Sequence, residues 1–118
     1  MDLRLQSRRF EVGGKEYEIL VNMNVLADLQ EAHGGSLAEA LDAGRGELHV
    51  ALEVLAAMLN EAADAAGAKE RFTARSLGRI LPTARAREVQ TIVAELLHAA
   101  LAPDDGAQAS EDGADSKN

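Results

Sequence analysis

Apolar and charged residues alternate along residues 10–20, FEVGGKEYEIL, on either side of two glycines. Gly13 and Gly14 permit the positive φ angles of a two-residue hairpin loop. A loop at these glycines sorts the flanking side chains into an apolar set, Phe10, Val12, Tyr17 and Ile19, and a charged set, Arg9, Glu11, Glu16 and Glu18. The pattern predicts a β-hairpin whose apolar face packs on other elements, because a two-stranded sheet is marginal alone. The register also predicts a Phe10–Tyr17 aromatic pair and an Arg9–Glu18 ion pair.

After the hairpin, apolar residues recur with helical spacing. Helices are predicted at residues 23–33, 37–43, 47–66, 74–81 and 83–102. Their expected N-caps are Asn22 or Asn24 for the first, Ser36 (with Glu39 completing a capping box) for the second, and Thr73 for the fourth. Glycines at 34–35 and 67 and the proline at 103 are expected to end helices, since these residues do not continue a regular helix.

The helical periodicity also assigns apolar positions to the interior. Inward positions are predicted at Val25, Leu26 and Leu29, at Leu48, Leu52, Leu55 and Leu59, and at Leu77, Ile80 and Leu81. The expected core is centred on Leu29, Leu52, Leu55, Leu96 and Leu97, with Phe10 and Tyr17 holding the hairpin on it. The predicted fold class is therefore mainly α: an N-terminal β-hairpin packed on about four to five helices over residues 1–102. Residues 103–118 are expected to form a flexible acidic tail, because no large apolar residue follows Leu101.

The last predicted helix carries an unusually wide apolar stripe. Its members are Val89, Ile92, Val93, Leu96, Leu97 and Leu101. Six large apolar residues exceed what a narrow core stripe needs, so part of the stripe is expected to stay open as a groove for a partner.

Composition limits the chemistry of this chain. Its 118 residues suit one domain, and apolar residues make up 47% of them but aromatic residues only 3%, so Leu, Val, Ile and Ala must form the core. Such a core predicts moderate stability or help from self-association. Without cysteine there are no disulfides, thiolate catalysis or Cys-ligated zinc. No secretory signal or run of 18 apolar residues is visible, so we expect a cytoplasmic protein with no membrane partner.

Charge is distributed unevenly. The formal net charge is −8, which argues against nucleic-acid binding because phosphate recognition normally uses a basic face. Residues 28–64 hold eight acids against one arginine, whereas residues 69–88 hold six basic residues against two acids. Solvated helix faces account for this pattern, and a complementary surface for a partner or a second copy is the alternative. Arg75, Arg79 and Arg85 are the candidate partner-binding residues of this basic segment, beside Val89, Ile92, Val93 and Leu96 of the apolar stripe.

No motif indicates catalysis or a cofactor. The three histidines fall on three different predicted helices without a second histidine at helical spacing, whereas a catalytic metal usually needs three convergent ligands. The glycine clusters are not followed by a Lys-Ser/Thr pair or arranged as GxGxxG, so they form no phosphate loop. We therefore expect no catalytic residue, metal or cofactor.

The order of these segments resembles the tail assembly chaperones of long-tailed phages and prophages. The matching positions are Gly14, Lys15, Tyr17, Asn24, Leu26, Leu29, Glu31, Gly35, Ser36, Leu37 and Glu39. The stretch FTARSLGRIL, residues 72–81, resembles the family's Thr-capped short helix, although the family more often has acids where this chain has Arg75 and Arg79. The resemblance extends over most of residues 10–102, and its motifs are structural rather than catalytic.

The resemblance implies a non-enzymatic assembly factor. Such chaperones bind the tape-measure protein, a very long helical chain, and keep it soluble in the host cytoplasm until tail-tube subunits polymerise around it. They are absent from the mature virion. Two other readings stay open at this point: a small phage structural protein such as a connector or adaptor, and an acidic regulator that binds a host protein or mimics nucleic acid.

Overall fold

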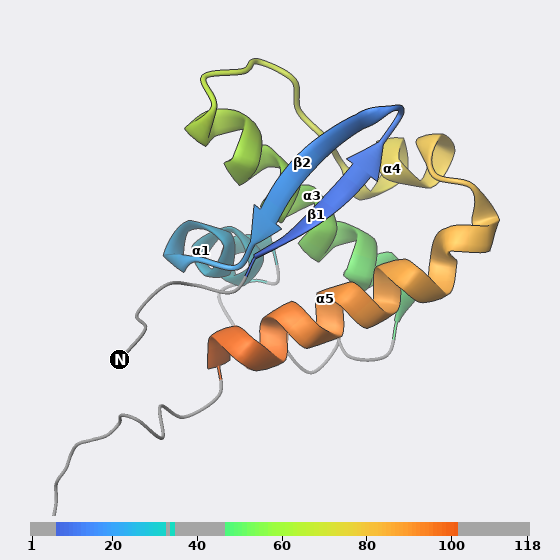
Figure 1. The fold of residues 1–118 in the computed structure, drawn as a ribbon. Helices are drawn as coiled ribbons and strands as arrows, with labels where there is room; N and C mark the ends of the chain where they lie inside the picture. Colours follow the sequence, from blue (N-terminus) through green and yellow to red (C-terminus); the bar gives the residue numbers. More distant parts are fainter. Residues whose placement is uncertain (1–6, 33, 35–46, 102–118) are drawn as a thin grey trace, which may run out of the picture.

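The computed structural model describes residues 7–32, 34 and 47–101 (Figure 1). Its elements are, in order, β1 (Ser7–Val12), β2 (Lys15–Leu20), α1 (Met23–Ala32), α3 (Leu48–Ala65), α4 (Ala74–Ile80), the 3-10 turn η1 (Thr83–Arg85) and α5 (Ala86–Leu101). The predicted class, a mainly helical protein that begins with an antiparallel hairpin, is confirmed. The helix predicted at 37–43 and the tail predicted at 103–118 lie outside the described residues.

The hairpin has the predicted register. Gly13 and Gly14 have φ angles of 59° and 85°, as a type I′ loop requires, and Phe10 pairs with Tyr17 across the strands. The predicted Arg9–Glu18 ion pair is wrong, since Glu18 instead accepts a hydrogen bond of 2.9 Å from the Ser7 hydroxyl. The apolar face is buried at Phe10, Val12 and Ile19 and half-buried at Tyr17.

Local sequence signals fix the helix ends. Asn22 rather than Asn24 caps α1, because the Val25 N–H donates to Asn22 Oδ1 at 3.0 Å. Thr73 caps α4 in a reciprocal capping box with Ser76. Gly67 ends α3 at a φ of 74°, and the next N–H returns to the Ala63 carbonyl at 2.8 Å. This is the glycine-terminated arrangement that satisfies the last carbonyls of a helix.

Helix α3 is the centre of the core, since α1, α4, α5 and β2 all pack on it. Buried side chains from every described helix and both strands form one cluster. The predicted core positions Leu29, Leu55, Leu96 and Leu97 are buried, and Leu52 is partly buried against them. None of the helices in the described part of the chain is long and apolar enough to span a membrane.

Two predicted inward positions, Leu48 and Ile80, are wrong, and Leu101 of the apolar stripe is exposed as well. Leu48, Ile80 and Leu101 keep exposed fractions of 40%, 44% and 40%. Each is the first or last residue of its helix. Periodicity assigns such a residue to the apolar face, but burial also needs a neighbouring element opposite it.

The prediction of an open apolar groove on α5 is also wrong. Val89, Ile92, Val93 and Leu96 are between 0% and 9% exposed. Helix α5 packs on α3, and Arg8 of β1 forms an ion pair with Glu95 of α5 at 2.9 Å. Five of the six stripe residues therefore belong to the core, and Leu101 at the end of the helix stays exposed.

Candidate partner-binding groove

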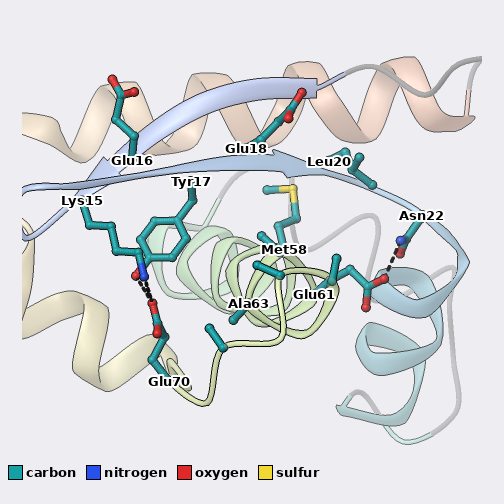
Figure 2. A pocket seen from close by; sticks show the side chains of 14 residues that line it. Lys15, Glu16, Tyr17, Glu18, Leu20, Asn22, Met58, Glu61, Ala63 and Glu70 are labelled. Atoms are coloured by element: carbon teal, nitrogen blue, oxygen red, sulfur yellow. Dashed lines mark hydrogen bonds and ion pairs between the residues drawn. The ribbon is translucent and has the colours of Figure 1, made fainter.

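A groove of about 490 Å³ runs between β2 and the C-terminal half of α3 (Figure 2). Residues 15–18 and Leu20 line the strand side, and alanines of residues 62–68 line much of the opposite side. Because consecutive residues of β2 take part, the border of the groove is the edge of the strand rather than one of its faces. Met58 lies between the two sides.

The hairpin register identifies which backbone groups meet the groove. In a two-residue hairpin the residues flanking the loop, here Val12 and Lys15, exchange both backbone hydrogen bonds, and hydrogen-bonded pairs then alternate along the ladder. Glu16, Glu18 and Leu20 therefore direct their N–H and C=O groups away from β1. In the described part of the chain, no group outside the hairpin hydrogen-bonds to the backbone of these three residues.

One end of the groove is closed by Lys15, Tyr17 and Glu70. Glu70 Oε2 accepts hydrogen bonds from Lys15 Nζ at 2.8 Å and from the Tyr17 hydroxyl at 2.5 Å. The hydrogen bond from Lys15, followed by that from Tyr17, lowers the pKa of Glu70. Burial, followed by the bond to Glu70, raises the pKa of Tyr17. The carboxylate is thus held charged and the phenol neutral.

Asn60 holds the segment that carries Glu70. Asn60 Nδ2 donates to the Phe72 carbonyl at 3.0 Å, and the Phe72 N–H donates to Asn60 Oδ1 at 2.7 Å. The Phe72 ring then meets the Tyr17 ring edge-on, with centroids 5.6 Å apart. Tyr17 therefore pairs with an aromatic ring beyond α3, and the predicted Phe10–Tyr17 ring pair does not form.

The other end of the groove is polar as well. Glu61 Oε2 accepts from Asn22 Nδ2 at 2.8 Å and from Asn24 Nδ2 at 3.1 Å. These amides are neutral, so they orient the Glu61 carboxylate without cancelling its charge. Glu16 and Glu18 are exposed and point away from α3 (Figure 2), so the carboxylates inside the groove are those of Glu61 and Glu70 at its two ends.

The lining defines what this groove does chemically. It offers backbone donors and acceptors along β2, the carboxylates of Glu61 and Glu70 at its ends, and a small apolar wall. It contains no Ser, Thr, Cys or His to act as nucleophile or imidazole base. The arrangement suits binding of a peptide segment.

The residues predicted to bind a partner lie elsewhere. Arg75 and Arg79 are exposed on α4 and do not line the groove. Arg85 has a structural role: its guanidinium lies 4.4 Å from the Phe10 ring centroid and donates to the Glu11 carbonyl at 2.6 Å. A hydrogen-bonded pair with Glu88 raises the pKa of Arg85 and lowers that of Glu88. The four apolar candidates on α5 belong to the core.

The histidines form no metal site in the described part of the chain. His49 pairs with Glu53 at 3.2 Å, and His33 lies outside the described residues. Residues 7–32, 34 and 47–101 contain no group of three potential metal ligands. Sequence reasoning missed Glu70, in a stretch without periodicity, and Asn60, whose amide within an otherwise apolar run was the available signal.

No protein family, curated protein or solved structure matches this chain. The groove and the sequence resemblance are therefore the grounds for assigning its function.

Proposed function

We propose that the protein is an assembly chaperone of the kind made by long-tailed phages. It binds the tape-measure protein in the host cytoplasm and keeps that long helical chain soluble until tail-tube subunits polymerise around it. The protein acts without catalysis or a cofactor and leaves the assembly before the virion is complete.

The observation that carries the proposal is the position of three residues that match the phage chaperone family. Lys15 and Tyr17 contact Glu70 at one end of the groove, and Asn24 contacts Glu61 at the other. Lys15 and Tyr17 of the hairpin line one partly apolar hollow, and Asn24 of the first helix contacts Glu61, which lines its other end. A chaperone needs a surface of this kind, on which apolar contact gives affinity and polar groups orient the partner.

The buried stripe on α5 changes the expected binding mode. Docking a partner on Val89 or Val93 would require opening the core, because these side chains are 1% and 0% exposed. The proposed contact is therefore the groove between β2 and α3, with the exposed Arg75 and Arg79 contributing at most electrostatic steering.

Co-expression with a tape-measure protein from the same genome tests the proposal. The partner should become soluble and co-purify, and the complex should persist at about 0.5 M salt, where exposed charges are strongly screened. Ala65→Trp, which fills the groove from an exposed position of α3, should abolish co-purification. The matched variant Ala99→Trp, at an exposed site on α5 outside the groove, should have no effect. Unchanged partner solubility with the unmodified chain would reject the proposal and favour the connector or adaptor reading.

A further inference from the structure

We propose that the outer edge of β2 is a docking site for one extended strand of another protein, with Lys or Arg at alternate positions and small apolar residues between them. The inference specifies the form and charge of the bound segment. It rests on the proposed function only for the identity of the protein that supplies this segment.

The backbone of β2 carries the first part of the inference. Glu16, Glu18 and Leu20 each present an outward N–H and C=O, and in the described part of the chain these groups have no partner beyond the hairpin. An unpaired strand edge is a template for another strand. A helix cannot fill this role, because its own ladder already uses its backbone groups.

The opposite wall of the groove leaves room for that strand. Neighbouring strands lie about 4.8 Å apart. Beyond the edge of β2, the groove is bordered by side chains no larger than a methyl group at Ala62, Ala63, Ala65, Ala66 and Ala68. Every second side chain of an added strand would face these alanines, so small apolar residues fit there.

Charge determines which residues fit the remaining positions of the added strand. The other side chains of the added strand would lie on the same face as Glu16 and Glu18, both of which are exposed. Opposite charges on neighbouring strands stabilise pairing and like charges oppose it.

The same charges argue against a second copy of this chain as the occupant. Antiparallel pairing of two β2 edges would bring Glu16 and Glu18 of one copy beside the same carboxylates of the other, which is destabilising. The outer edge of β1 is partly occupied, because the Glu11 carbonyl accepts a hydrogen bond from Arg85. The site therefore fits a basic segment of a different chain.

Two synthetic peptides test the inference without the natural partner. The first has the sequence Lys-Ala-Lys-Val-Lys-Ala-Lys-Val, and the second replaces every Lys by Glu. Hydrogen exchange measured by NMR on the full chain should show the first peptide slowing exchange of the Glu16, Glu18 and Leu20 amides by about tenfold or more. The second peptide should leave these rates unchanged.

Three variants separate backbone pairing from charge. Glu18→Pro removes an outward N–H while leaving the hairpin ladder intact, since proline is tolerated where the N–H faces away from the neighbouring strand. It should abolish protection at Glu16 and Leu20. Arg9→Pro, at the cross-strand position on the outer edge of β1, is the matched control and should retain protection. Glu18→Gln keeps the N–H and should only weaken binding of the Lys peptide.

Absence of protection with the Lys peptide at about 1 mM, the range of weak binding, would overturn the inference. Equal protection by both peptides, or full protection in Glu18→Pro, would overturn it as well. These outcomes are independent of whether the chain solubilises a tape-measure protein. A failed chaperone assay beside a positive peptide result would reject the proposed function and leave the strand-docking site in place.

Discussion

Replacing Asn60 by alanine should destabilise the protein and loosen one end of the groove. The Asn60 side chain pairs with both backbone groups of Phe72 and so attaches the segment after α3 to that helix. Phe72 in turn packs on Tyr17, whose hydroxyl donates to Glu70. One amide therefore supports the whole Lys15–Tyr17–Glu70 cluster.

The magnitude follows from the two hydrogen bonds and the helix position. Each bond contributes about 0.5–1.5 kcal/mol net, so losing both costs about 1–3 kcal/mol. Alanine offsets part of this loss, because it favours a helix interior over asparagine by up to about 0.7 kcal/mol. With the full offset, the expected net loss is therefore about 0.3–2.3 kcal/mol.

Urea unfolding followed by circular dichroism measures this loss. Thr91→Ala, an exposed position within α5, is the control for helix propensity and should stabilise the protein by up to about 0.7 kcal/mol. Asn60→Asp should destabilise at neutral pH, because a carboxylate accepts from the Phe72 N–H but cannot donate to the Phe72 carbonyl. Exchange of the Phe72 amide should accelerate in Asn60→Ala, which removes the acceptor of its N–H.

An unchanged unfolding midpoint together with an unchanged Phe72 amide exchange rate in Asn60→Ala would contradict the proposed role of Asn60. That result would mean that packing of the Phe72 ring holds the segment in place. Faster exchange at Phe72 with an unchanged midpoint would also contradict the predicted energy.

Three further predictions concern pH, the core and a glycine. When Tyr17 is titrated by its phenolate absorbance, the midpoint should lie above the ordinary pKa of 10.0, and Glu70→Gln should lower that midpoint. The raised pKa means that folding favours the neutral phenol. Tyr17 should therefore contribute a constant amount to the free energy of unfolding below the ordinary pKa, and this contribution should be lost as pH rises through the folded-state pKa. A free energy of unfolding that does not change over that upper pH range would contradict the prediction. Leu55→Ala should cost about 2–5 kcal/mol in urea unfolding, whereas Leu48→Ala should cost less than about 0.5 kcal/mol; similar losses would place both in the core. Gly78→Ala should stabilise by about 0.5–1 kcal/mol, since a Cβ there meets nothing within 4 Å in α4, and a lower thermal midpoint would refute this.

Local signals in the sequence determined much of the fold. The glycines at 13 and 14 fixed the loop, and strict alternation fixed which hairpin side chains face inward. Thr73 and Gly67 marked helix ends correctly, because capping depends on residues only a few positions apart. These features were predictable since their physical causes lie within one turn of the chain.

Only the tertiary structure decided how far each apolar face is covered and where the groove lies. Periodicity placed Val89 and Leu48 on apolar faces alike, yet packing of α5 on α3 buried the first, and the position at the start of α3 left the second exposed. The groove depends on Tyr17 meeting Glu70, residues 53 positions apart that no local pattern connects. Burial and long-range hydrogen bonds depend on which elements lie opposite one another, and the period of a single segment carries no information about its neighbours.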